Sequence, residues 1–460
     1  MSGCKIPQTA DLRRANNLPQ TFTVGSTDTL MDADLNWKSI FKDQHLRALI
    51  DSALTNNQEL LITLQEIGIA QNDVRLRNAP LFPAVKARIG AGLEKVGRYT
   101  SQGAGDASTD ILPGKEMPEP LQDYTAVISA NWELDIWKKL RNAKKAAITR
   151  YLSTVEGKNF VRSNLVAEIA SSYYELLALD NELEIVQQNI ALQKNALEVV
   201  KVQKQASRVT ELAVQKFQAE VLKSAGMQFD LEQQITEAEN RINFLLGRYP
   251  QPIPRDKSKL MSTLPSQIKS GIPAQLLSNR PDIKRAELEL LAAKLDVKAA
   301  RAEFYPSLGI SAGIGFQAFK PSYLFRLPES LLYSLAGDVT APLINRNAIK
   351  AEFSTANAKQ IQALFNYERT VLNAYLEVRN QLSGIDNLNK RYELKSAQVD
   401  ALTKSIELSN DLFSAARADY LEVLMTQRDV LESKLELVET RKAQLTACVN
   451  IYKFLGGGWQ

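Results

Sequence analysis

The sequence has few of the side chains on which metal sites and most enzyme active sites depend. It contains one histidine, His45, and two cysteines. A zinc site needs three or four closely spaced Cys, His or carboxylate ligands, and nucleophilic catalysis needs a Ser or Cys activated by a nearby base. Neither a Walker loop nor a dinucleotide fingerprint is present. We therefore expect no catalytic residue, no metal, no bound cofactor and no enzyme activity.

Long hydrophobic runs and a strong charge bias are also missing. No apolar run reaches the roughly 18 residues that a membrane-spanning helix needs, so we expect no such helix. The net charge is only +4, with Lys and Arg spread along predicted helical faces. This distribution indicates a solvated surface rather than a nucleic-acid site.

The N-terminus carries a short motif of its own. Ser2, Gly3 and Cys4 follow the small-small-Cys order at which bacterial lipoprotein signals end. We expect Cys4 to be the first residue of the mature protein and to carry lipid, which anchors a chain by roughly 0.8 kcal/mol per buried CH₂. The alternative is a chance cysteine near the N-terminus.

What the sequence does have is an internal repeat. Asn57 and Arg280 each open a predicted helix that ends at an aromatic-proline pair, Phe82-Pro83 or Tyr305-Pro306. Each proline starts an alternating β pattern, which leads into a long helical block. Both blocks end alike, and the two endings are Phe244-Leu245-Leu246-Gly247 and Phe454-Leu455-Gly456.

Side chains with a period of two predict one β-hairpin in each repeat. Four strands are expected, each with an apolar and a polar face, and turn-rich loops at about 102–122 and 319–332 join them. The apolar faces hold Val85, Ala87, Ile89, Ala91 and Leu93; Tyr124, Ala126, Ile128, Ala130, Trp132, Leu134 and Ile136; Leu308, Ile310, Ala312, Ile314 and Phe316; and Leu335, Gly337, Val339, Ala341 and Leu343.

One chain supplies too few strands to close a sheet. An open edge in lipid leaves backbone groups unpaired at several kcal/mol each, so strands of other copies must complete the wall. Three copies give about twelve strands, enough to enclose a lumen. In that arrangement Lys86, Arg88 and Glu94 line the water-filled interior, while Trp132, Trp137 and Phe316 face lipid. A soluble sandwich that uses the same alternation is the alternative.

The helical blocks at about 142–246 and 347–455 are nearly free of Gly and Pro and rich in helix formers. Each is expected to fold back near its middle, at 207–210 and 416–419. A helix of about 60 residues extends roughly 90 Å, which suits a bundle, a coiled coil or a tube. The simplest alternative is a structural coiled coil.

These patterns together resemble the TolC-type outer membrane factors, and the lipoprotein (NodT/OprM/CusC-like) branch is the most similar. The similarity runs from about Trp37 to Gly457. The stretches that carry it are Trp37 to Asp43 with Leu46 and Leu49-Ile50, Leu277 to Ile283 with Ala286-Glu287, Ser171 to Asp180, Asp419 to Leu424 with Gln427, and Phe454 to Trp459.

The resemblance implies a mainly α chain with a membrane β-barrel: a trimeric 12-stranded barrel continuous with a 12-helix periplasmic tunnel. Such ducts close at the periplasmic helix tips, where acidic residues ring the pore. Asp419 is the nearest acid here, with Arg417 beside it, and both are gate candidates. The family's usual Gly and Asp are replaced by Ala416 and Ala418. Simple helix capping or an Arg417 ion pair is the alternative role for Asp419.

The function implied is a passive outer-membrane exit duct of a tripartite efflux pump in a Gram-negative cell. Its partners would be two further copies, a periplasmic adaptor, an inner-membrane transporter of the RND type and outer-membrane lipid. A type I secretion channel and a non-channel periplasmic scaffold remain alternatives, and the cargo is open.

The repeat also predicts a division of the chain. The expected segments are an N-terminal segment at 1–44, repeat 1 at 45–247 with a β-hairpin at about 83–137 and a helical hairpin at about 142–246, a Pro-rich linker at 248–270, and repeat 2 at 271–460 with a β-hairpin at about 306–344 and a helical hairpin at about 347–455.

Overall fold

The computed structural model describes residues 19–22, 36–262, 269–342, 347–415 and 417–459. These residues are mostly helical, with one four-stranded antiparallel sheet. They form two compact units: the first contains Gly68–Leu152 and Glu287–Phe365, and the second contains the other described segments. Each unit therefore draws on both repeats.

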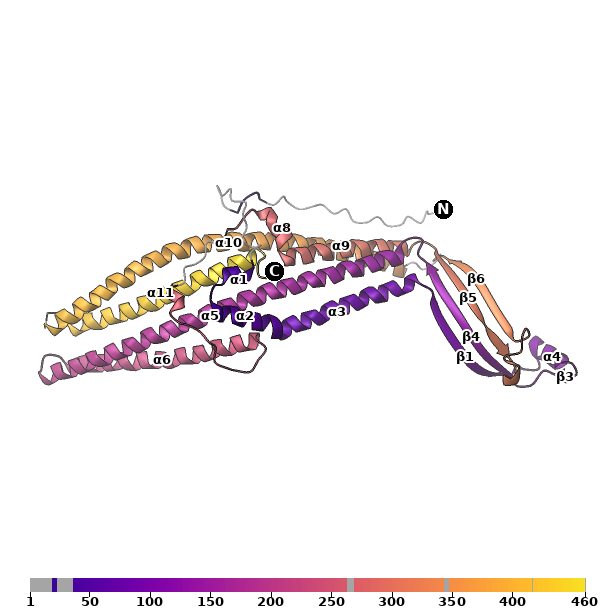
Figure 1. Ribbon diagram of the computed structural model, residues 1–460, viewed down its shortest axis with the longest axis horizontal. Coiled ribbons are helices and arrows are strands. Elements are labelled where there is room, and N and C mark those ends of the chain that lie inside the picture. The colour runs from indigo at the N-terminus through magenta and orange to yellow at the C-terminus, as the bar shows by residue number, and fades with distance from the viewer. Residues whose placement is uncertain (1–18, 23–35, 263–268, 343–346, 416, 460) are drawn as a thin grey trace. The chain divides into compact units, whose positions relative to one another are not determined.

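The first unit contains the four strands expected from the alternation. Their order across the sheet is β1-β4-β5-β6, so β1 and β6 are the edges (Figure 1). The register places Ile128 opposite Ile314, and Ile314 opposite Tyr333, so apolar side chains share one face. The bounds are Ala84–Glu94 for β1, Leu121–Leu134 for β4, Ser307–Ala318 for β5 and Leu331–Thr340 for β6.

Two strand ends differ from the expectation. The β4 strand stops at Leu134 because the Asp135 carboxylate accepts the backbone N–H groups of Leu140 and Arg141 and so caps the following helix. Ile136 and Trp137 therefore lie beyond the strand. The β6 strand begins four residues before Leu335 and ends at Thr340, so Ala341, which precedes Pro342, lies outside it. Leu343 is outside the described residues.

The turn-rich loop predicted between β1 and β4 also contains short regular elements. It contains helix α4 (Ser101–Ser108) and a small hairpin of β2 (Asp110–Leu112) and β3 (Lys115–Glu116). The Thr100 hydroxyl caps α4 by accepting the Gly103 N–H at 3.1 Å. A Cβ at Gly103 would collide with the Gly97 carbonyl, so only glycine allows this close approach.

The second unit contains most of the helical hairpins. Helices α5 and α10 have 67 and 68 residues, and the returning helices α6 and α11 have 35 each. Two long, folded-back helices per chain agree with the sequence prediction. The helices of the chain are α1 Trp37–Ile40, α2 Gln44–Asn56, α3 Gln58–Asn78, α5 Lys139–Gln205, α6 Glu211–Leu245, α7 Lys259–Ser262, α8 Leu276–Asn279, α9 Pro281–Ala302, α10 Asn347–Ser414 and α11 Tyr420–Phe454.

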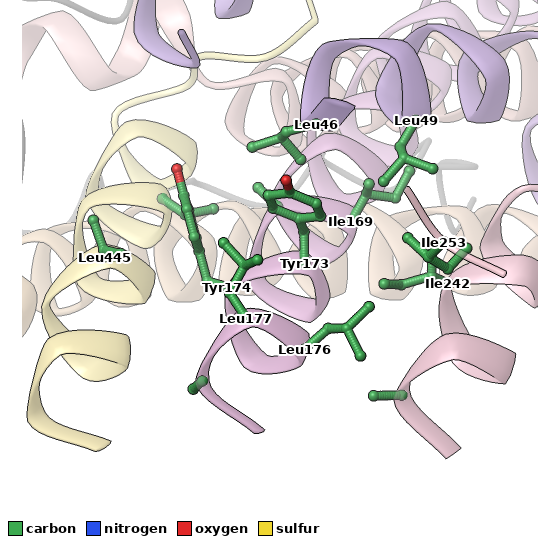
Figure 2. Close-up of a cluster of buried hydrophobic side chains, with 14 of the residues drawn as sticks. Leu46, Leu49, Ile169, Tyr173, Tyr174, Leu176, Leu177, Ile242, Ile253 and Leu445 are labelled. Carbon is green, nitrogen blue, oxygen red and sulfur yellow. The ribbon is translucent and has the colours of Figure 1, made fainter. Parts of the chain in front are cut away.

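The main core of the second unit forms where α2 packs on α5 and α6. Leu46 and Leu49 of α2 lie against Ile169 and Tyr173 of α5 (Figure 2). Burying each such side chain contributes roughly 1.5–3 kcal/mol. The Tyr173 hydroxyl donates to Asp43, whose other oxygen caps α2, and burial raises the pKa of this phenol well above its ordinary value. The contact fixes the first amphipathic helix on the long one.

The two repeats close in the same way at the ends of α6 and α11. Gly247 (φ +67) and Gly456 (φ +94) each follow the last helical turn. An added Cβ would strike the carbonyl oxygen of Asn56 in the first case and of Asn279 in the second. Two separate constraints therefore require glycine at each position: the positive φ angle and the close approach of the Asn56 or Asn279 carbonyl.

A side chain completes each closure. Asn57 Nδ2 donates to the Leu245 carbonyl at 2.9 Å, and Arg280 Nη1 donates to the Phe454 carbonyl at 3.0 Å. We call these two sites clamp 1 (Asn56, Asn57, Leu245, Gly247) and clamp 2 (Asn279, Arg280, Phe454, Gly456). Both tie the returning helix to the start of the repeat's first long helix, α3 or α9.

Candidate functional site

The polar face of the sheet contains all three residues predicted to face a lumen. Lys86 and Arg88 lie in the first half of β1 and Glu94 at its end, and all three side chains are exposed. Asp123 of β4 lies directly opposite Gly92 of β1, and Asp338 of β6 lies opposite Gly309 of β5, so the strand register places both on this face too. The structure places the three predicted residues on one surface but does not bring them into contact.

Sequence reasoning named only the charges of β1 and missed those of the other strands. Asp338 lies between Gly337 and Val339, which belong to the predicted apolar face of β6. The same period of two therefore places Asp338 on the polar face. Gly309 lies directly opposite, and a Cβ there would be 2.7 Å from the Asp338 carboxylate. Gln317 Nε2 donates to Asp123 at 2.9 Å. This face therefore has polar residues on every strand, and the glycines of β5 leave it without large side chains at their positions.

The opposite face of the sheet is apolar and uncovered. Ile89 is 89% exposed, and Tyr333 and Leu335 are each 80% exposed. A contiguous apolar surface of this kind marks an interface with lipid or with another protein. The other large members of this face are Val85, Leu93, Ile128, Ile314 and Val339.

Aromatic side chains gather where the strands meet the helices of the first unit. Trp137 stacks on Tyr305 with ring centroids 4.7 Å apart, and its Nε1 donates to the Pro306 carbonyl at 2.7 Å. They line a cavity of about 230 Å³ together with Lys139 and Glu303. An indole with its N–H satisfied beside an apolar strand face is typical of a membrane–water interface.

This junction also contains a pair of interacting carboxyl groups. Burial and the neighbouring Glu352 carboxyl raise the pKa of Glu303 to about 7, and Glu133 adds a smaller effect in the same direction. Lys139 opposes the shift, and it is itself paired with Glu133 at 2.5 Å. The pKa of Glu303 therefore lies in the physiological range.

The ends of the two helical hairpins share a hydrophobic cluster in the second unit. We call it the tip cluster; Phe217 of α6 and Phe413 of α10 are its large members, and its other buried members are Leu197, Val200, Ala213, Val214, Val221, Val423 and Leu424. Arg428 of α11 pairs with Glu220 of α6 at 3.5 Å beside the cluster. Separating the hairpins would expose these side chains.

The gate candidates Arg417 and Asp419 lie at this end of α10 and α11. Both side chains are exposed. Asp419 occupies the N-cap of α11 with an extended backbone (ψ 147), but its side chain accepts no capping hydrogen bond. Within the described residues, no ion pair within 4 Å involves Arg417 or Asp419. The gate assignment stays a prediction, and Ala416 is outside the described residues.

The remaining predicted site, Cys4, also lies outside the described residues. Across the ranges that are described, no three His, Cys, Asp or Glu side chains are grouped so as to hold a metal ion. None of the helices in those ranges combines the length and apolar composition of a membrane-spanning segment.

Comparison with known proteins supports these observations. A family model described as outer membrane efflux protein matches residues 49–248 and 272–457, one segment in each repeat. The pyoverdine export outer membrane protein OpmQ of Pseudomonas aeruginosa is 30% identical over 92% of this chain and 87% of its own length. The cation efflux system protein CusC of Escherichia coli is 26% identical over 100% of this chain and 97% of its own.

Solved structures share the fold. A membrane protein from Pseudomonas aeruginosa superposes with a TM-score of 0.85 at 25% identity, covering 98% of this chain and 97% of its own. A crystal structure of CusC superposes with a TM-score of 0.84 at 24% identity, covering 98% and 99%. The outer-membrane channel OprN gives a TM-score of 0.84 at 23% identity, covering 98% and 99%. The predicted fold class is confirmed.

Proposed function

The chain belongs to the outer membrane efflux protein family, and from this premise we propose that it forms a trimeric exit duct of a tripartite efflux pump. The observation that carries the proposal is the sheet, which exposes a continuous apolar face and has two open edges, β1 and β6. Neither feature is stable in water by itself. Both are satisfied when three copies join edge to edge in the outer membrane of a Gram-negative cell.

In the closed wall, β1 of one copy pairs with β6 of the next, giving twelve strands. The apolar face meets lipid, and the polar face with Lys86, Arg88 and Glu94 lines the water-filled interior. The helical hairpins of the three copies form the periplasmic tunnel. A lipid on Cys4 adds a second attachment to the membrane.

The helix tips act as the gate in this proposal. The tip cluster and the Arg428–Glu220 pair hold the hairpin ends together, so the duct is closed until a partner separates them. Asp419 and Arg417 are exposed at that end and would line the narrowest point. We expect neutralising Asp419 to raise the flux through the isolated duct.

The duct itself supplies neither energy nor catalysis. We propose that it is not an enzyme, that it carries no cofactor other than the lipid, and that its partners are a periplasmic adaptor and an inner-membrane transporter of the RND type. Its relatives are named for pyoverdine export, cation efflux and solvent efflux. This variety favours cargo selection by the partners rather than by the duct.

Reconstitution into planar bilayers tests the proposal. The purified protein should have the mass of three copies in detergent and should conduct ions. The double substitution Lys86→Glu and Arg88→Glu should shift the conductance toward cations, because it reverses two charges on the lumen face. The control Lys201→Glu changes a half-exposed helical lysine away from the strands and should leave the ion preference unchanged. A soluble single copy without conductance would contradict the proposal.

A further inference from the structure

The short loop between β5 and β6, residues 319–330, contains a cluster of aromatic and basic side chains. Phe325 packs on Phe316 of β5, with ring centroids 5.5 Å apart. The Arg326 guanidinium lies 4.9 Å from the centre of the Tyr323 ring. Lys320 Nζ lies 5.9 Å from the Phe319 ring, which in turn packs on Tyr323 at 5.3 Å. We call these residues the aromatic-basic cluster.

The two cations of this cluster have no carboxylate partner. Within the described part of the chain, neither Lys320 nor Arg326 takes part in an ion pair within 4 Å. By contrast, Arg98 in the loop between β1 and β4 pairs with Glu119 at 3.0 Å. Glu329 is the one acidic residue in 319–330. The cluster therefore presents unneutralised positive charge.

The cluster is also continuous with the uncovered apolar face of the sheet. Phe316 belongs to that face, opposite Leu331 of β6. Phe325, which is 72% exposed, extends it into the loop, and Leu327 is 64% exposed. Along this line the surface changes from aliphatic strand residues to aromatic rings and then to free cations.

From this order we infer that the aromatic-basic cluster binds the phosphate-bearing headgroup of a membrane lipid in the leaflet that surrounds the loop. A lipid presents the same sequence of chemistry: acyl chains, an interfacial layer that suits aromatic rings, and an anionic phosphate. Arg and Lys donate charge-assisted hydrogen bonds to phosphate oxygens. The inference rests on the proposed membrane insertion and goes beyond it, because a duct can conduct without a selected lipid.

Lipid retention by the detergent-purified protein tests the inference. The probes are a bis-phosphorylated glycolipid (lipid A), the same lipid A after dephosphorylation, and inorganic phosphate. Native mass spectrometry should show lipid A retained, with the dephosphorylated form held at least about tenfold more weakly, since each basic residue near an anionic surface is worth about 1 kcal/mol. Inorganic phosphate at the same concentration should not displace it.

The double substitution Lys320→Gln and Arg326→Gln should reduce lipid A retention by about tenfold or more. The matched control is Lys95→Gln with Lys115→Gln, which removes two exposed lysines between β1 and β4 that have no ion pair within 4 Å among the described residues. The control should retain lipid A like the wild type. Equal retention by the Lys320/Arg326 variant, equal loss in the control, or displacement by free phosphate would overturn the inference.

Bilayer conductance of the same preparations separates this inference from the proposed function. All variants should conduct like the wild type, because neither pair lies on the four strands of the main sheet, β1, β4, β5 and β6. Normal conductance without a difference in lipid retention would contradict the lipid site alone. Absence of conductance in the wild type would contradict the proposed duct.

Discussion

Clamp 1 and clamp 2 solve one geometric problem with different chemistry. In both, a glycine with positive φ ends the returning helix and a side chain from the repeat's start donates to the carbonyl of the second residue before it. Asn57 and Arg280 are equally buried, at 5% exposed. Yet Asn57 is neutral, while Arg280 is paired with Asp282 at 2.6 Å and with Glu377 at 2.8 Å.

The difference separates what the backbone requires from what the side chain contributes. The two glycines are dictated by main-chain geometry and have no substitute. The donor to the carbonyl can be either an amide or a guanidinium, but a charged donor in a buried site needs carboxylate partners. Clamp 2 therefore extends to α10 through Glu377, whereas clamp 1 stays local, with Asn57 Oδ1 accepting the Leu60 N–H. We expect repeat 2 to be the more sensitive to loss of its donor.

The largest expected effect is the loss of Arg280. Arg280→Ala should destabilise the protein by about 3 kcal/mol, since it leaves two half-buried carboxylates without a cation. Asn57→Ala should cost about 1–2 kcal/mol, since it removes one buried hydrogen bond and one helix cap. Denaturant unfolding of both variants in detergent measures the difference.

A third variant decides whether charge explains this gap. Combining Arg280→Ala with Glu377→Gln should recover part of the lost stability, because one unpaired carboxylate is removed. If the double variant is as unstable as Arg280→Ala, or if Asn57→Ala proves the more damaging single change, the charge-based account of clamp 2 is wrong.

Substituting the two glycines should instead give equal effects. Gly247→Ala and Gly456→Ala each place a Cβ against a carbonyl oxygen and force a strained φ, at a cost of about 1–3 kcal/mol each. The control is Gly226→Ala in the middle of α6, where nothing lies within 4 Å, and it should stabilise by about 0.5–1 kcal/mol. Melting temperatures provide the measurement, and clearly unequal losses would show that the clamps differ in backbone geometry too.

The repeats can also be compared by their titration. Among the described residues, each has a glutamate whose pKa is raised to about 7: Glu182, through burial and then Glu439, and Glu303, through burial and then Glu352. The folded state therefore binds these protons more tightly than the unfolded state, where the pKa is near 4.5. Their contribution to stability is complete below pH 4.5 and is lost as the pH rises to about 7.

Glu182→Gln and Glu303→Gln should each raise the melting temperature at pH 8 and leave it unchanged near pH 4.5. The increase should be larger for Glu182, which is the more buried of the two, since solvent weakens the effect at Glu303. Thermal scans across this pH range provide the test. A wild-type protein whose stability rises between pH 4.5 and 7, with no change in either variant, would contradict the assignment.

The smallest expected effect concerns the partly exposed ion pair between the repeats. Arg428→Ala removes the contact with Glu220 and should cost less than about 1 kcal/mol, but it should increase duct opening. The matched control is Arg241→Ala, whose pair with Glu168 at 3.2 Å lies within repeat 1 and should not affect opening. The difference in single-channel opening should disappear at 1 M salt, where charges are screened within about 3 Å.

Much of the fold was predictable from the sequence because the patterns involved are local and repeated. A period of two along Ser307 to Gln317 identifies a strand and its two faces without tertiary information. Blocks nearly free of Gly and Pro identify the long helices, and the interruptions between them identify the tips. The duplication adds a check, since each feature is seen twice.

The parts that were missed depend on contacts between distant residues. The repeat pattern predicts Asn57 and Arg280 as helix starts, but nothing near them in sequence indicates the carbonyls of Leu245 and Phe454 to which they donate. Helix α4 contains Gly103 and Gly105, which disfavour a helix, and it forms because Gly103 packs on the Gly97 backbone. The pairing of Glu220 with Arg428 likewise follows only from helix packing.

Helices α6 and α11 have the same length, 35 residues each, and this equality fixes the length of the helical hairpins in the second unit. Each of these helices begins at the tip cluster and ends at a clamp. Contacts at both ends therefore fix its position along the helix axis. A longer duct cannot arise by lengthening one hairpin alone. A single added turn would move its tip residues away from the residues of the other repeat that they contact in the tip cluster. Only matched insertions in both hairpins, on outgoing and returning helices alike, preserve the fit. Natural variation in reach should therefore come in paired steps.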